Sequence, residues 1–414
     1  MRFQNAIAIR FLPTNVGTHK VVAMPSSIPA SRSHDPASNS SSGTPQPHEP
    51  HNTDTAANNQ SQQPLDLKIS ASRQFTSWLH DEVISLAFTT YQSQLLLMVG
   101  FNAQTQQLSV GVRNFGRAMG LYVTPDTERL YLSTKYQLWQ LDNTLQPGAS
   151  YKRHDRAYVP RVGYTTGDLD IHDVVMDGSN RPIFVCTMLN CLATVSDKYS
   201  CVPLWTPPFI SKVVSEDRCH LNGLAAVDGH AKYVTLVNPS DILEGWRTKR
   251  RSGGCVMDVP SNEIVATGLS MPHSPRFYDG KLWLLNSGTG EFGYIDLNTG
   301  WFEPIAFCPG YLRGLAFHEH FAIVGLSTVR SKRGGVMSGL ELDERLHKQD
   351  VESRCGLMVI DLTTGAIVHW LRLEGHISEL YDVQVLSGVR RPLALGFQTD
   401  EISRLLTIAP PGKL

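Results

Sequence analysis

Short runs of strand-forming residues recur from about residue 66 almost to the end of the chain, separated by turns rich in Gly, Asp, Asn and Pro. The clearest unit spans residues 270–290, where Asp279-Gly280 lies between two apolar runs, a strong signal for a β-hairpin. Similar units begin at residues 84–90, 119–125, 171–177, 221–227, 274–280, 312–318 and 380–386. A multi-strand unit that recurs every ~40–50 residues predicts a β-propeller, because each blade buries its faces against its neighbours.

We therefore expect an all-β fold with seven blades, and six as the alternative because the first unit is weakly marked. The C-terminal run at 404–410 is expected to finish the last blade, and a strand near 74–79 to pair beside it and close the ring. Two polar stretches, 238–254 and 328–354, interrupt the repeat. They either cap a site or are solvated surface loops.

The first 65 residues differ from the rest of the chain. Residues 35–64 contain no Val, Ile, Leu, Met or aromatic residue, so they lack the apolar surface that would offset the entropy of ordering. Residues 1–34 hold four basic residues and no acidic one, so this segment is either an organelle-targeting segment or an unstructured or mis-assigned start. We expect a disordered, low-complexity N-terminal arm over 1–65 and a propeller domain over 66–414.

The charge and cysteine content narrow the function classes. The chain has 37 Lys and Arg against 38 Asp and Glu, which gives no support for nucleic-acid binding. It contains no apolar run long enough for a transmembrane helix. Its seven scattered cysteines form no CxxC pair, which indicates reduced, mostly buried thiols and a cytoplasmic protein. The oligomeric state is left open.

Three histidines open or precede successive predicted inner strands. His172, His220 and His273 are separated by 48 and 53 residues, close to the repeat, so their imidazoles are expected to converge on the channel axis. Three such ligands with an open position suit a catalytic transition-metal ion such as iron, copper or zinc. A metal-free polar pocket or plain structural hydrogen bonding are the alternatives. Glu379 and Asp382 are predicted to transfer protons.

A second set of polar residues lies at or near the predicted inner strands. Arg117, Arg276 and Arg313 are expected to capture an anionic group of a substrate, and Asn222 to contact the substrate or orient a histidine. The alternative is that these guanidinium groups pair with acids such as Glu379 and Asp382. Either outcome places arginine beside acid in the channel.

Residues 70–412 resemble the TIGR03032-type family of uncharacterised bacterial proteins. The stretches that carry the resemblance are LSMPHSPRFYDGKLWLLNSGTGEFGYID, FCPGYLRGLAFHEHFAIVGLS and ISELYDVQVLSGVRRP. The resemblance implies a propeller-like fold. It implies no activity and no catalytic residues.

These patterns lead to two hypotheses for function. The first is a metal-dependent enzyme that acts on a small molecule or peptide at the channel mouth, by oxidation or lyase chemistry. The second is a non-catalytic propeller that binds a peptide, glycan or anionic ligand at the same place.

Overall fold

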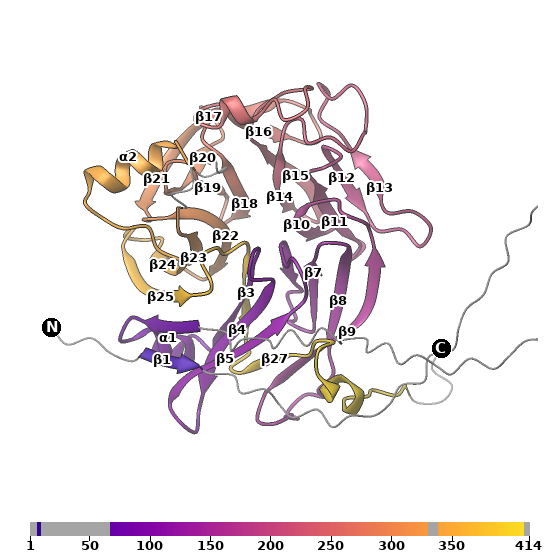
Figure 1. Ribbon diagram of the computed structural model, residues 1–414, viewed down its shortest axis with the longest axis vertical. Coiled ribbons are helices and arrows are strands. Elements are labelled where there is room, and N and C mark those ends of the chain that lie inside the picture. Colours follow the sequence, from indigo (N-terminus) through magenta and orange to yellow (C-terminus); the bar gives the residue numbers. More distant parts are fainter. Residues whose placement is uncertain (1–5, 10–66, 330–337, 410–414) are drawn as a thin grey trace, which may run out of the picture. The chain divides into compact units, whose positions relative to one another are not determined.

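The computed structural model describes residues 6–9, 67–329 and 338–409. Strands dominate, and they form six sheets that lie around a common axis (Figure 1). The innermost strands contact one another in a closed order, β22, β26, β6, β10, β14, β18 and back to β22. The protein is therefore an all-β, six-bladed propeller: the preferred count of seven blades was wrong, and the alternative of six is confirmed.

Each blade is an antiparallel sheet whose first strand lies nearest the axis. We number the blades in the order of their second strands along the chain. Blade 1 contains β26 (Val383–Ser387), β3 (Ile84–Thr90), β4 (Leu95–Asn102) and β5 (Gln107–Asn114). Blade 2 contains β6 (Leu121–Val123), β7 (Arg129–Ser133), β8 (Gln137–Asn143) and β9 (Arg156–Thr165). Blade 3 contains β10 (Ile171–Met176), β11 (Pro182–Cys186), β12 (Cys191–Thr194) and β13 (Val202–Trp205).

The other three blades repeat this plan. Blade 4 contains β14 (Leu221–Val227), β15 (His230–Leu236), β16 (Gly254–Asp258) and β17 (Ile264–Leu269). Blade 5 contains β18 (Pro272–Tyr278), β19 (Lys281–Asn286), β20 (Glu291–Asp296) and β21 (Trp301–Phe307). Blade 6 contains β22 (Tyr311–His318), β23 (Phe321–Ser327), β24 (Gly356–Asp361) and β25 (Ile367–Gly375), and β2 (Leu67–Ala71) and β1 (Ala6–Ile9) extend its outer edge.

The blade count differs from the prediction because the first and last predicted units belong to one sheet. Residues 84–90 form β3, the second strand of blade 1, and not an inner strand. Its inner neighbour is β26 from the C-terminal unit, with Val383 opposite Phe88. A blade built from both ends of the chain closes the ring without an unpaired inner edge.

The predicted closing strands at the two ends were wrong as well. Residues 74–79 lie mostly in helix α1 (Phe75–Asp81), and the run 404–410 forms no strand over its described part. A 3₁₀ turn, η2 (Asp400–Arg404), precedes that run. The strand that follows β26 is β27 (Pro392–Ala394), which pairs parallel to β9 at the outer edge of blade 2. Apart from 6–9, the predicted N-terminal arm lies outside the described residues.

Apolar side chains fill the spaces between neighbouring blades, as the recurring pattern requires. One cluster joins blades 3 and 4 through residues such as Val185, Leu224 and Leu236, and similar clusters join blades 1 and 2, 2 and 3, 4 and 5, and 5 and 6. The hairpin predicted at Asp279-Gly280 is confirmed: both residues have positive φ, 47° and 72°, which a two-residue turn of this kind requires. All seven cysteines are free thiols, and six are buried.

Hydroxyl groups connect each blade to the next near the axis. A Ser or Thr at or just after the end of a blade's second strand donates a hydrogen bond to a backbone carbonyl of the following blade, at 2.6–3.2 Å. The five donors are Thr89, Ser133, Thr187, Ser287 and Ser327. Between blades 4 and 5 the amide of Asn222 donates to Pro272 O instead, at 3.1 Å. The residue after each accepting carbonyl is the axial residue of its blade.

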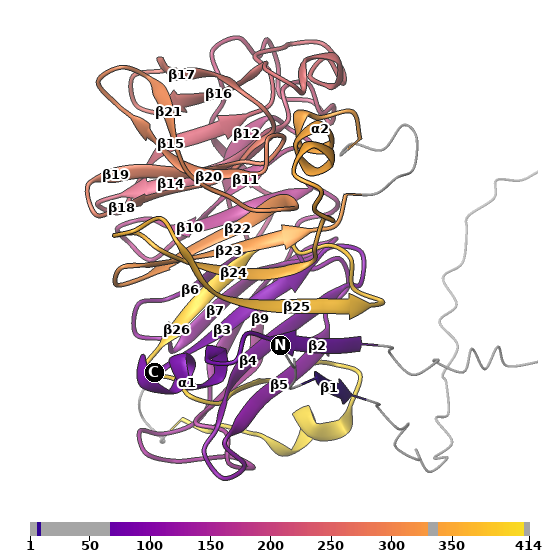
Figure 2. The ribbon, with the colours of Figure 1, turned by 90° about the vertical axis from the view of Figure 1, so that its left-hand side faces the viewer.

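The axial residues bring polar groups to the centre of the ring. Five of them carry polar side chains: His172 in blade 3, Asn222 in blade 4, His273 in blade 5, Arg313 in blade 6 and Tyr381 in blade 1; the sixth, in blade 2, is Gly120. The α-helix α2 (Glu341–Lys348) lies at one end of the ring and α1 at the other (Figure 2). No helix among the described residues is long and apolar enough to cross a membrane.

Candidate functional site

A pocket of about 470 Å³ lies at the end of the channel that α2 flanks, a volume that suits a small molecule. Axial residues form its floor, and the loop between β15 and β16 forms part of its wall. The lining residues are Tyr91, Gln92, Asp170, His172, Met188, Ser215, Glu216, Asp217, His220, Leu243, Glu244, Trp246, Arg247, Arg313, Glu379 and Tyr381.

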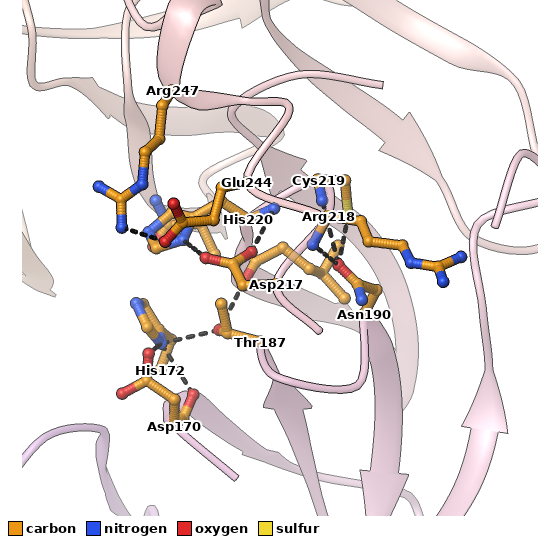
Figure 3. A network of polar contacts seen from close by, with 12 residues as sticks. Asp170, His172, Thr187, Asn190, Asp217, Arg218, Cys219, His220, Glu244 and Arg247 are labelled. Atoms are coloured by element: carbon orange, nitrogen blue, oxygen red, sulfur yellow. Dashed lines mark hydrogen bonds and ion pairs between the residues drawn. The ribbon is translucent and has the colours of Figure 1, made fainter. Parts of the chain in front are cut away.

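His172 is held with one ring nitrogen toward the protein. Its Nδ1 lies 2.8 Å from the backbone oxygen of Asp170 and 2.8 Å from Oγ1 of Thr187 (Figure 3). The Thr187 hydroxyl already donates its proton to Leu221 O, so Nδ1 of His172 carries a proton and donates it. Burial lowers the pKa of His172 to about 4, so at neutral pH the ring is uncharged and its Nε2 carries a free lone pair.

His220 is oriented by a carboxylate. Its Nδ1 donates to Oδ2 of Asp217 at 2.7 Å, and its backbone N–H donates to Oδ1 of the same group at 2.9 Å (Figure 3). Two bonds from one residue to one carboxylate fix both the ring and its tautomer. The ring centroids of His220 and His172 are 5.1 Å apart, and no hydrogen bond to Nε2 of either ring occurs within the described residues.

His273 differs from the other two predicted ligands. Its Nδ1 lies 2.8 Å from Met271 O, and its Nε2 lies 3.0 Å from the amide nitrogen of Asn222, so both ring nitrogens are used within the protein. It does not line the pocket described above. Burial holds its pKa well below the ordinary value. The predicted metal at these three histidines stays a prediction.

The three histidines are also not equivalent in the repeat. His172 and His273 are axial residues, but the axial residue of blade 4 is Asn222, whereas His220 directly precedes β14 with φ at 51°. The spacing of 50 and 51 residues among His172, Asn222 and His273 is more regular than 48 and 53. The more regular spacing predicts that Asn222, and not His220, is the repeat equivalent of His172 and His273.

Arg313 and Glu379 form a buried ion pair on the pocket floor, with Nη1 and Oε1 2.5 Å apart. The guanidinium group lies 5.2 Å from the ring centroid of Tyr311 and 5.0 Å from that of Tyr381. Burial opposes the charge of Arg313, yet the facing carboxylate holds its pKa above the ordinary value. Of the predicted substrate-binding arginines, Arg313 lines the pocket directly.

Arg117 lies beside the pocket. Its guanidinium group pairs with Asp168 and Asp170 and lies 5.6 Å from the ring centroid of Tyr91. Two of these partners, Asp170 and Tyr91, line the pocket.

Arg276 and Asp382 lie in a different network. Arg276 donates to both oxygens of Asp173, at 2.8 and 3.2 Å, and lies 3.5 Å from Asp382. Each carboxylate also accepts a backbone N–H from its own strand and one from the next blade, Leu224 N for Asp173 and Leu121 N for Asp382. Burial raises the pKa of Asp382 to about 7. These groups connect inner strands, and neither lines the pocket.

The insertion in blade 4 lines the pocket through Leu243, Glu244, Trp246 and Arg247, and the insertion in blade 6 packs against it from behind. Trp246, from the insertion in blade 4, is 1% exposed and stacks on His220 with ring centroids 4.2 Å apart. A cluster that includes Leu342 and Leu346 of α2, from the insertion in blade 6, packs around it. Residues 330–337 of that second insertion lie outside the described residues. Neither Asp217 nor Trp246 had been predicted as a site residue.

His172 is expected to make folding stability depend on pH. The folded protein holds its pKa near 4, against 6.5 for an ordinary histidine, so its contribution is intact above pH 6.5 and is lost as the pH falls toward 4. Between pH 8 and pH 5, the free energy of unfolding should fall by about 2 kcal/mol more in the wild type than in His172→Asn. Asn occupies the equivalent position in blade 4.

Urea unfolding at both pH values measures this difference. The exposed His230, replaced by Asn, is the control and should follow the wild type. Parallel pH profiles for the wild type and His172→Asn would show that the imidazole is not held uncharged.

Known domain families and curated proteins show what the chain is similar to. Residues 73–395 match a domain family described as a domain of unknown function, DUF4915. This match supports the resemblance to an uncharacterised family, whereas the TIGR03032-type assignment itself stays a prediction. No curated protein matches the chain.

Two solved structures match much of the chain. The crystal structure of a nidogen/laminin complex is 10% identical with a TM-score of 0.47, and the match covers 73% of this chain and 99% of that one. A streptogramin B lyase structure is 12% identical with a TM-score of 0.36, over 68% and 74% of the two chains. At this level of similarity neither structure informs the function of the pocket.

Proposed function

Because this chain belongs to the DUF4915 family, whose function is unknown, we propose a function from the pocket itself: the protein is an enzyme that removes a proton from a small polar molecule bound at the mouth of the channel. The observation that carries the proposal is the His220–Asp217 pair. The Asp217 carboxylate accepts a hydrogen bond from Nδ1 of His220, with Oδ2 and Nδ1 2.7 Å apart. Nε2 of His220 is therefore the basic nitrogen of this ring in the pocket wall.

The surrounding residues support acid–base chemistry. His172 supplies a second uncharged imidazole whose ring centroid is 5.1 Å from that of His220. Arg313 supplies a positive charge that Glu379 balances until substrate binds. A guanidinium group beside the reacting atoms stabilises the negative charge that develops when a proton leaves carbon.

This arrangement suits lyase chemistry. Nε2 of His220 takes a proton from a carbon atom of the substrate, and the electron pair of that C–H bond forms a double bond as a leaving group departs from the neighbouring atom. Asp217 stabilises the imidazolium that results. Arg313 is the candidate for orienting an anionic or carbonyl group, and Glu379 retains its predicted role in proton transfer.

The metal-dependent form of the hypothesis keeps two of the three predicted ligands. His172 and His220 would offer Nε2 to an iron, copper or zinc ion in the pocket, and such an ion would supply Lewis-acid chemistry. Loss of a bound metal ion on replacing either residue would support this form.

A cytoplasmic location remains our expectation.

Replacing His220 by Asn is expected to lower turnover by about 10²–10⁴-fold, because Asn keeps the donor to Asp217 but removes the base. Cell metabolites would be incubated with the wild type and the variant in D₂O, and products and deuterium incorporation followed by mass spectrometry. Products or exchange should appear with the wild type and with His230→Asn, and be lost with His220→Asn. Equal turnover by the wild type and His220→Asn would refute the assignment. Bound metabolites without turnover would instead support the alternative, a non-catalytic binding module.

A further inference from the structure

A second group of metal-ligand side chains lies at the opposite end of the ring from the pocket. Glu82, directly after α1, meets His318 and Glu319 at the end of β22, and their ligand atoms all lie within 4.8 Å of one another. In the described part of the chain, this is the one group of three or more His, Cys, Asp or Glu side chains that meets this distance. β22 carries Arg313 near its other end, roughly 16 Å away along the strand.

One ring nitrogen of His318 lacks a hydrogen bond. Its side chain is 13% exposed, and Nε2 is buried without a hydrogen bond. The nearest acid, Oε2 of Glu82, lies 3.3 Å away but in a poor direction for a hydrogen bond. Leaving a buried polar atom without a partner costs free energy, so a missing partner is the direct explanation.

The same distance fits a shared metal ion. Two ligands that each lie ~2.05 Å from a tetrahedral zinc ion are themselves about 3.3–3.4 Å apart. One imidazole nitrogen with two carboxylates suits zinc and neighbouring first-row metals, whereas calcium and magnesium prefer oxygen ligands throughout.

We propose that Glu82, His318 and Glu319 bind a divalent transition-metal ion, with zinc as the favoured ion and water as the fourth ligand. The ion connects the end of α1 to the turn between β22 and β23. Next to this site, α1 also contacts the start of β23 through Trp78 and Phe321, whose ring centroids are 5.5 Å apart. The site is therefore structural, and it is separate from the pocket chemistry.

The test is a zinc titration of the full chain, purified without a histidine tag and stripped with a chelator, followed by calorimetry. One zinc ion per chain is expected, and His318→Asn should weaken its binding at least about tenfold. Glu319→Gln, which changes an exposed turn residue and so preserves the fold, should also weaken it. His320→Asn, an exposed histidine two residues from His318, is the matched control and should bind like the wild type.

Cobalt gives an independent readout, because a tetrahedral site with nitrogen and oxygen ligands produces visible absorption bands that His318→Asn should abolish. The proposal is overturned if zinc does not bind, or if binding is unchanged in His318→Asn and Glu319→Gln. It is also overturned if binding is lost in His172→Asn or His220→Asn instead, since the ion would then be in the pocket.

Discussion

A chain that ends at Asp382 is expected not to fold into a stable propeller. This truncation removes β26, the innermost strand of blade 1, and leaves β3 with an unpaired edge although all seven of its residues are buried in the intact protein. It also removes five large buried aliphatic side chains, each of which contributes about 2 kcal/mol, and the total is comparable to the whole stability of a typical domain. The removed side chains are Val383, Leu386, Val389, Leu393 and Leu395.

Size-exclusion chromatography and thermal unfolding followed by circular dichroism measure this effect. The truncated chain should elute early or aggregate, and it should show no cooperative transition. Deletion of residues 406–414 is the control and should leave the transition in place, because its described part, 406–409, is exposed and forms no strand. A compact, cooperatively unfolding monomer that lacks β26 would mean that the closing strand is dispensable.

Replacing Arg276 by Met is expected to lower the free energy of unfolding by about 3–5 kcal/mol at pH 8, because it leaves Asp173 and Asp382 as buried carboxylates without their shared cation. The loss should be smaller at pH 5. Burial raises the pKa of Asp382 to about 7, so at pH 5 this group is protonated and depends less on Arg276.

Chemical unfolding at the two pH values separates the two effects. Arg129→Met removes a partly exposed pair with Asp142 and serves as the control, with an expected loss of less than about 1 kcal/mol. A loss in Arg276→Met as small as the control's, or one that does not change with pH, would contradict the described network.

The sequence was sufficient to identify the propeller but not to count its blades. Seven segments have the composition of an inner strand, because β3 is as apolar as the true inner strands. The first unit could have provided its own inner strand, or it could have received one from the C-terminal end of the chain. Which of the two occurs is decided by how the ring closes, and this depends on tertiary packing. One feature indicated that the first unit lacks an inner strand: only three strands, β3, β4 and β5, precede the next unit, one fewer than in a full blade.

The candidate site was partly predictable for a similar reason. Repeat spacing relates His172 to His273, which occupy equivalent positions, but the equivalent position in blade 4 is Asn222 and not His220. Asp217 and Trp246 lie in connections outside the repeat, where no periodicity predicts a contact with His220. The meeting of two insertions from different blades depends on tertiary packing.

The shared blade also has a consequence for biosynthesis. A ribosome makes β3 near the start of the domain and makes its partner β26 close to the end, so the nascent protein displays an apolar strand with one unpaired edge for most of its synthesis. Such edges promote association between chains. Soluble yield in a cell should therefore depend on chaperones that shield the emerging polypeptide until translation has delivered the last strand.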